Sequence, residues 1–520
     1  MKAQTNNNNF TSGEFTPRLR GRSDLEKYNS SASTLGNLVV LRHGGVTKRP
    51  SRDYLGEVKS SADGARLIEF VFSRVDAYVL ELGNLYMRVW KNGAIIGGGT
   101  PYEVVTPWTI AQVADLDYAQ GGDTLIVVHP SVVPYRIQRI TDSNWTVGLV
   151  PFDPPALEDQ NGTPAQVCTP SAASPIGGAC TLTLGAGGWV SGHVGSHVEI
   201  NGGLVKITAY SSPTVVNGII LRVLASTTAA PIDAWSLREP VWTATNGYPS
   251  TVTFHQQRLW LGGSLKFPQS KWGSKSGLYY DFTSGTEDDA TVFKTINSDE
   301  VNIIQYLVNN GQLVTLTYGA EFTTRGGVEK PVTQLNAQID MQSKWGTNRV
   351  RPQVVGRTIL AAQRGGKALR AYSVGDYEAL NSRDVSVYSE HLLRDGIKSM
   401  TFEQDPEHVL WIATNSGKLL ALTFNEEQNI AALCSADHGG AVEWLANIPE
   451  ADTDATYCIT RYTINGVTKR YVERINWAAA PGQDSRKAMT GASATVWAVG
   501  THLEGCLLYT SDAADEAYDV

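Results

Sequence analysis

The sequence contains no run of about 20 apolar residues, the length that a helix needs to cross a bilayer, so we expect no membrane segment. Four asparagines follow residues 1–5 where a signal peptide has an apolar stretch, and we expect no secretory signal. Cysteine is scarce: the chain has five, and no two form a Cys-x-x-Cys pair. This predicts buried or free thiols in a reducing compartment, with a disulfide between Cys168 and Cys180 as the open alternative.

Charge is also sparse in this chain. Charged residues make up 18% and hydrophobic residues 42%, which is typical of globular proteins and not of disordered ones. The formal net charge is −8, whereas proteins that grip DNA by its phosphates are normally basic. The acidic balance is compatible with a protein past which double-stranded DNA moves without being held.

Motifs of common enzymes and metal proteins are missing. There is no His-Glu-x-x-His and no glycine-rich phosphate loop ending in Gly-Lys-Ser/Thr. We therefore predict a non-enzymatic protein with no catalytic, cofactor-binding or metal-binding residues. Two weak candidates are a Ser–Lys hydrolase arrangement within Ser274, Lys275 and Ser276, and a metal site at His193 and His197. We favour a polar turn for the first and two unconnected histidines for the second.

Two further groups of residues have structural explanations that we prefer. The acidic clusters Glu287, Asp288, Asp289 and Asp452, Asp454 lack the other ligands of a calcium loop, which predicts solvated loops. Tryptophans on predicted strands could stack on carbohydrate, but core packing is the favoured interpretation. They are Trp242, Trp260, Trp272, Trp345 and Trp411.

Glycine-rich turns and aromatic-rich strands predict an all-β protein. The chain has 50 glycines, 13 tryptophans and 21 tyrosines. Residues 67–72, 77–82 and 85–90 read as three strands of a meander. An apolar strand after a polar turn recurs around Tyr78, Leu125, Leu259, Leu313, Ile359, Leu410 and Tyr457.

The spacing of these seven anchor positions is close to 50 residues, apart from one gap of 134 between Leu125 and Leu259. Four-stranded units repeating every 40–50 residues or so are typical of β-propellers. We therefore predict propeller-like repeats, with unrelated meanders or a β-sandwich as the alternative. The long gap predicts an inserted small β-barrel or sandwich, within which 198–200 and 204–208 form a hairpin across an Asn-Gly-Gly turn.

These patterns divide the chain into six predicted parts. They are an extended N-terminal docking arm (1–55), the first blades (56–150), the inserted β module (151–245), the remaining blades (246–480), the start of a truncated C-terminal region (481–505) and residues 506–520. The last part resembles the translation of a sequencing adapter, with an ordinary acidic tail as the alternative.

A basic cluster in the arm is the charged feature with the clearest possible role. Arg18, Arg20 and Arg22 alternate, so an extended chain would place them on one side. Together with Lys48 and Arg49 they are our candidates for docking to a partner protein through carboxylates. A solvated arm and contact with DNA phosphates are the alternatives.

An ordered series of segments resembles the tail nozzle family of podoviruses, also called tail tubular protein B. The likeness covers residues 10–145 and, more loosely, 250–330. It is carried by residues 44–50, 66–70, 78–80, 85–90, 113–118, 123–129 and 271–282.

The resemblance implies a structural subunit of a tailed-phage virion, made in the host cytoplasm. It implies a ring of identical copies, six by the family pattern, below an adjacent adaptor or gatekeeper protein, with double-stranded DNA passing through. It transfers no catalytic residues. The alternatives are a receptor- or glycan-binding tail protein, with or without glycosidase activity, and a cellular propeller scaffold.

Overall fold

The computed structural model describes residues 9–158, 165–285, 287–298, 300–327, 330–375, 379–436, 439–479 and 481–486. Beyond these it describes only the backbone of two short strands, β38 (Leu507–Leu508) and β39 (Tyr518–Asp519). The residues that resemble a sequencing adapter otherwise lie outside the described part. In the described part no helix has the length and apolar character to span a membrane.

Seven antiparallel sheets, which we number as blades 1 to 7, make up most of the described chain. In blades 1 to 3 the strands are β4 (Arg66–Val71), β5 (Ala77–Gly83), β6 (Tyr86–Lys91), β7 (Ala94–Ile95) and β8 (Glu103–Val105); β9 (Asp117–Gly121), β10 (Thr124–His129), β11 (Val132–Thr141) and β12 (Asn144–Leu149); and β19 (Thr251–His255), β20 (Arg258–Gly262), β21 (Ser270–Gly273) and β22 (Val292–Thr295). A single helical turn, α1 (Ile110–Val113), joins blades 1 and 2.

Blades 4 to 7 repeat the same four-stranded order. Their strands are β23 (Ile304–Asn310), β24 (Gln312–Thr317), β25 (Glu321–Arg325) and β26 (Gln338–Ser343); β27 (Gln353–Val355), β28 (Thr358–Ala362), β29 (Leu369–Val374) and β30 (Leu380–Asp384); β31 (Ile397–Glu403), β32 (Val409–Thr414), β33 (Leu419–Asn425) and β34 (Ile430–Ala436); and β35 (Ala441–Glu450), β36 (Thr453–Ile464), β37 (Val467–Asn476) and β3 (Ser51–Glu57).

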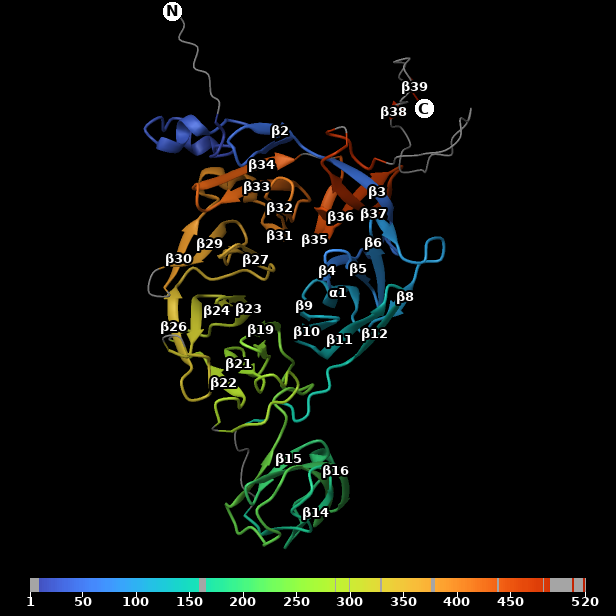
Figure 1. Ribbon diagram of the computed structural model, residues 1–520, viewed down its shortest axis with the longest axis vertical. Helices are drawn as coiled ribbons and strands as arrows, with labels where there is room; N and C mark the ends of the chain where they lie inside the picture. The colour runs from blue at the N-terminus through green and yellow to red at the C-terminus, as the bar shows by residue number, and fades with distance from the viewer. Residues whose placement is uncertain are drawn as a thin grey trace, which may run out of the picture.

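The seven blades form a closed β-propeller (Figure 1). A separate hydrophobic cluster fills each interface between successive blades, including the interface between blade 7 and blade 1. Each blade has two apolar faces and buries them only against its neighbours. Closing the ring therefore leaves neither face of any blade in water. The predicted propeller fold is confirmed.

Each of the seven sequence anchors lies on the second strand of its blade. Tyr78 is on β5, Leu125 on β10, Leu259 on β20, Leu313 on β24, Ile359 on β28, Leu410 on β32 and Tyr457 on β36. All seven are fully buried, at 0% exposure. The period of about 50 residues in the sequence therefore marks one strand of each blade that is covered on both sides, which is why its apolar run is uninterrupted.

Strand β3 closes the ring. It is the outer strand of blade 7 and pairs antiparallel with β37, joining Ser51 to Asn476 and Glu57 to Tyr471. The predicted arm ends at residue 55, but the structure places residues 51–57 in the propeller. Pairing across more than 400 residues leaves no local signal, so neither strand alone reveals its partner.

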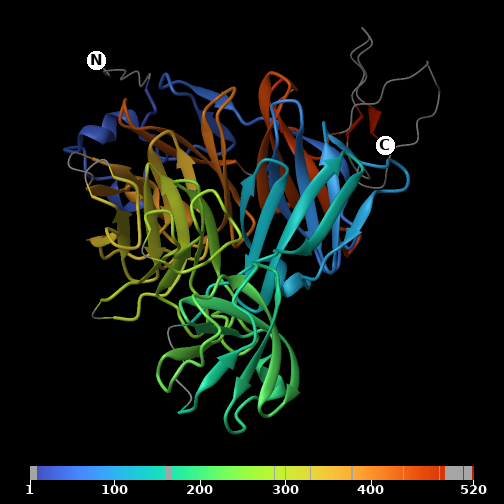
Figure 2. The ribbon, with the colours of Figure 1, turned by 60° about the horizontal axis from the view of Figure 1, so that its bottom comes forward.

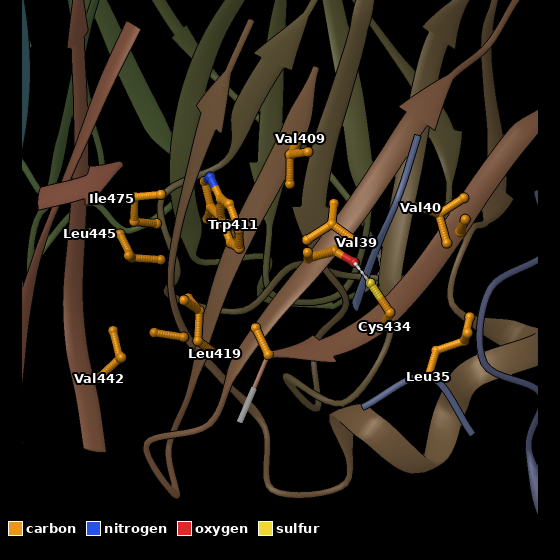
Figure 3. Close-up of a cluster of buried hydrophobic side chains, with 14 of the residues drawn as sticks. Leu35, Val39, Val40, Val409, Trp411, Leu419, Cys434, Val442, Leu445 and Ile475 are labelled. Carbon is orange, nitrogen blue, oxygen red and sulfur yellow. Dashed lines mark hydrogen bonds between the residues drawn. The ribbon is translucent and has the colours of Figure 1, made fainter. Parts of the chain in front are cut away.

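The remaining arm packs on blade 6. It contains two short 3-10 helices, η1 (Pro17–Leu19) and η2 (Glu26–Ser30), and a hairpin of β1 (Leu38–Val40) and β2 (Val46–Lys48). Leu35, Val39 and Val40 join the hydrophobic cluster between blades 6 and 7, beside Trp411 and Cys434 (Figure 3). Burial of these arm residues fixes the segment to the ring.

The inserted module projects from the ring between blades 2 and 3 (Figures 1 and 2). Its six-stranded sheet has the order β13-β14-β17-β16-β15-β18 around one core. The strands are β13 (Cys168–Pro170), β14 (Ala179–Leu184), β15 (His197–Ile200), β16 (Gly203–Ser212), β17 (Val215–Arg222) and β18 (Trp235–Arg238). The predicted hairpin is β15–β16. Cys168 and Cys180 are both buried free thiols in this core.

Candidate functional site

The arginines of the arm do not lie on an extended chain. Arg18 is within η1, and Arg20 is its C-cap in the right-handed helical region, so the alternation does not place the three on one side. Arg18 forms an ion pair with Glu390 at 3.1 Å, and Arg22 pairs with Asp24 at 2.7 Å. The predicted common face of Arg18, Arg20 and Arg22 is therefore wrong in its geometry.

Of the two basic residues near the end of the arm, only Lys48 is exposed. The other, Arg49, is 6% exposed. Its guanidinium donates to the side chain of Asn37, to the carbonyl of Gly482 and to the carboxylate of Asp484. Arg49 is thus fully engaged in holding the arm to the segment after β37, and it is unsuited to docking a partner.

The centre of the ring gathers cations and aromatic rings from the first strands of several blades. Arg66 of β4 lies 4.9 Å from the ring of Trp444 on β35. Arg351, which precedes β27, lies 3.8 Å from the ring of Tyr118 on β9, and Arg66 is 5.9 Å from the same ring. These cation–π contacts join blade 1 to blade 7 and the segment leading into blade 5 to blade 2.

These central cations are held by groups within the chain. One nitrogen of Arg66 donates to the carbonyls of Val113, Ala114 and Leu116 at 2.8–3.1 Å. Arg351 pairs with the buried carboxylate of Asp117. The cavity that remains between them is about 30 Å³, comparable to the volume of one water molecule. Arg66, Arg351 and the rings that they contact therefore occupy this part of the ring centre.

A groove of about 630 Å³ lies between blades 2 and 3. We call it the blade 2/3 groove. It is continuous with a second hollow of about 290 Å³ toward the centre, since both share Gln120, Phe254 and Asn309. Its other lining residues are Gly121, Gly122, Thr124, Ile126, His255, Gln256, Gln257, Tyr279 and Tyr280.

Every side chain that lines the blade 2/3 groove is uncharged or, in the case of His255, held neutral. Burial lowers the pKa of His255, against the opposing effect of its contact with Asn309 at 3.0 Å. Its other ring nitrogen, Nε2, is buried without a hydrogen-bond partner. Polar recognition in the groove thus depends on amides, hydroxyls and one imidazole.

The candidates for catalysis and metal binding do not come together. His193 packs against Trp189, whereas His197 is fully buried on β15, where burial lowers its pKa to about 4. Ser274 is buried and accepts the backbone N–H of Leu259. Within the described part of the chain no three His, Cys, Asp or Glu side chains are grouped to hold a metal ion.

The acidic clusters lie on the surface. Glu287, Asp288 and Asp289 are exposed, and Asp289 pairs with Lys275 at 3.2 Å. Asp452 pairs with Arg74 at 3.2 Å.

Four of the five tryptophans are core residues, as the favoured interpretation has it. Trp242, Trp260, Trp272 and Trp411 are 8% exposed or less. Trp345 is the exception: it is 45% exposed, and the guanidinium of Arg370 lies 3.5 Å from its ring.

No protein-family model matches the chain, and no curated protein matches it. Among solved structures, the Neurospora crassa Pan2 WD40 domain matches at 7% identity over 71% of this chain and 90% of that one, with a TM-score of 0.30. Kluyveromyces lactis Hsv2 matches at 7% over 72% and 98% (TM-score 0.29), and the RRP9 WD40 repeats at 8% over 82% and 99% (TM-score 0.37). The propeller assignment rests on the blades and interfaces described above.

Proposed function

We propose that the protein is a structural subunit of a tailed-phage tail nozzle, in which identical copies form a ring around the path of the ejected DNA. Two things support the proposal: the series of segments in residues 10–145 that resembles this family, and a propeller that carries a projecting β module. The proposed role is mechanical and needs no catalytic residue.

The observation that carries the proposal is the outer face of strands β14 and β17 on the inserted module, whose own side chains are uncharged; Lys206 of β16, opposite Ile219, borders it and pairs with Asp153 at 3.5 Å. Strands β14 and β17 pair there so that Ala179 lies opposite Ile219, Thr181 opposite Asn217 and Thr183 opposite Val215. These residues alternate with buried ones and so point away from the module core.

Apolar side chains continue this outer face along the module. Ile219 is 38% exposed and Val223, four residues on, is 48% exposed. Ile176, which precedes the turn bonded to Ile220, is 66% exposed. Clustered exposed apolar residues are typical of protein interfaces. The side chains of β14 and β17 on this face carry no charge to desolvate against a second copy, and the bordering Lys206 is already paired with Asp153. A second copy is the partner that a closed ring needs.

The filling of the ring centre by side chains agrees with this arrangement. Because Arg66, Arg351 and their aromatic partners occupy the centre, the DNA path in our proposal runs between copies, along their outer surfaces. The net charge of −8 would weaken adhesion of phosphates to such a wall. The adjacent adaptor protein, the virion location and the sixfold ring belong to the same proposal.

Sedimentation analysis of the purified chain tests the proposal. We expect a concentration-dependent species with the mass of a ring, and we expect Ile219→Glu to shift it toward the monomer because a carboxylate would be buried at the contact. Val105→Glu is the matched control, since Val105 is 78% exposed on the outer strand β8 of blade 1. A wild-type monomer at every accessible concentration, or equal behaviour of both variants, would contradict the proposal.

A further inference from the structure

The blade 2/3 groove has the composition of a ligand site that excludes charge. The residues that line its 630 Å³ include no Asp, Glu, Lys or Arg. In the connected inner hollow, Arg351 is the one charged residue, and it is already paired with Asp117. A charged ligand would lose its hydration in the groove without gaining a counter-charge, which is costly.

Aromatic rings form one wall of this groove. Phe254 and Tyr279 meet edge to face with centroids 5.2 Å apart, and Tyr279 is 40% exposed. Gly121 lies against this wall, since a Cβ there would be 3.3 Å from the ring of Phe254, and Gly122 beside it has a φ of +59° and open space around it. A side chain at Gly121 would therefore crowd Phe254, and the absence of side chains at both glycines leaves the exposed ring of Tyr279 as the accessible aromatic surface.

Polar groups able to make directed hydrogen bonds lie next to these rings. Gln256 and Gln257 form the turn between β19 and β20, in which His255 pairs with Arg258. The carbonyl of the Gln256 side chain accepts the N–H of Val332, which fixes that side chain. His255 adds a buried Nε2 that has no partner in the described residues. An amide offers both donors and acceptors, and an imidazole offers one of either.

The turn that presents these glutamines is strained. Gln256 has a φ of +48° and Gln257 a φ of +56°, so two consecutive residues with side chains occupy the left-handed region. Two-residue turns of this type favour Asn-Gly or other glycine-containing pairs. Strained backbone is concentrated at ligand sites. Glycine would adopt these angles without strain, but it would remove the two amide side chains that lie beside the groove.

We propose that the blade 2/3 groove binds a neutral oligosaccharide. The faces of sugar rings are apolar and stack on aromatic side chains, while their hydroxyls donate to and accept from amides. Nucleic acid fits poorly because the groove offers no unpaired cation for its phosphates. The inference does not depend on ring formation, since all lining residues come from blades 2, 3 and 4 of one chain.

Saturation-transfer NMR with the full chain tests this site, using maltohexaose and cellohexaose as neutral probes and sialyllactose as the charged counterpart. We expect saturable transfer from at least one neutral probe and little from sialyllactose. Tyr279→Ala and Gln257→Ala should each weaken binding about tenfold, the effect of losing one stacking or hydrogen-bonding partner in a small site.

Tyr318→Ala is the matched control, because Tyr318 is 51% exposed and does not line the groove. The affinity of this variant for the neutral probes should remain within about twofold of that of the wild type, a smaller change than removal of a binding partner would cause. The inference is overturned if neither neutral probe shows saturable transfer. It is also overturned if Tyr318→Ala loses as much affinity as Tyr279→Ala, or if sialyllactose binds as well as the neutral probes. Circular dichroism of each variant separates loss of binding from loss of fold.

Discussion

Two fully buried cations, in different parts of the ring, show how a neighbouring carboxylate determines whether a buried basic group stays protonated. Arg52 on β3 lies 2.9 Å from the carboxylate of Glu473 on β37, and both side chains are at 1% exposure or less. Lys271 on β21 is equally buried, but its ammonium contacts only the hydroxyls of Thr315, at 2.8 Å, and Thr324. One cation is matched by a carboxylate, whereas the other forms no ion pair within the described residues.

The consequences for charge are opposite. Burial opposes the charged form of Arg52, yet Glu473 raises the pKa of Arg52 above its ordinary value. Burial alone lowers the pKa of Lys271 to about 7. Blade 7 therefore closes the ring with a stable ion pair, whereas the interface between blades 3 and 4 contains an amine that changes charge near neutral pH.

Removing the carboxylate partner of Arg52 should have the largest effect. In Glu473→Gln the guanidinium stays buried with only Asp484, at 3.3 Å, as a charged partner. We expect a loss of about 3 kcal/mol in the free energy of unfolding, measured by urea denaturation. The double variant Arg52→Met, Glu473→Leu should recover most of it, because no unpaired charge remains. A loss below about 1 kcal/mol for Glu473→Gln would mean that this pair does not hold the closing strand.

The pH dependence of stability tests the second cation. Between pH 7 and about 10.4, the ordinary pKa of lysine, the folded protein holds Lys271 neutral while the unfolded chain keeps its proton. The free energy of unfolding should therefore rise with pH in this window, by about 1.4 kcal/mol per pH unit from this group. Below pH 7 both states are protonated and the contribution is constant.

Lys271→Met should abolish this rise, as measured by urea denaturation from pH 6 to pH 10. Lys48→Met is the control, because Lys48 is exposed on β2 and its substitution should leave the slope unchanged. If wild type and Lys271→Met show parallel curves, the amine is solvated or paired in solution and the contrast with Arg52 disappears.

Removing an ion pair on the surface should have the smallest effect on the free energy of unfolding. Arg18 and Glu390 are 70% and 39% exposed, so water screens their attraction. We expect Arg18→Ala to change the free energy of unfolding by about 0.5 kcal/mol or less. A loss above about 1.5 kcal/mol would show that this residue anchors the arm, giving it the structural importance we assign to Arg49.

The sequence alone predicted the repeating blades but not the pairing of β3 with β37 that closes the ring. Buried second strands recur with a fixed spacing, so residues such as Leu313 and Leu410 could be found from local apolar runs. The pairing of β3 with β37 depends on contacts across the whole chain, which leave no local pattern. The same holds for the blade 2/3 groove: Phe254 and Tyr279 are ordinary strand and loop aromatics until the fold brings them together.

Two predictions made from residue type alone were wrong because the surroundings of the side chain could not be inferred from the sequence. Trp345 fits the pattern of a core tryptophan, but it lies on the surface beneath Arg370. Arg49 fits the pattern of a docking residue, but the structure buries it against Asp484. In both cases the decisive partner is distant in sequence or belongs to another strand. The Gln256–Gln257 turn was not predicted either, because it lacks the Asn-Gly or glycine pair that usually marks two consecutive residues in the left-handed region.

Electron microscopy of the purified chain in negative stain tests the proposed role most directly. Our account predicts closed rings of identical copies, each copy a compact propeller, with the inserted modules in contact between neighbours and an opening at the ring centre wide enough for duplex DNA. Separate single propellers under all conditions, or rings whose contacts leave the β14–β17 face in solvent, would contradict it.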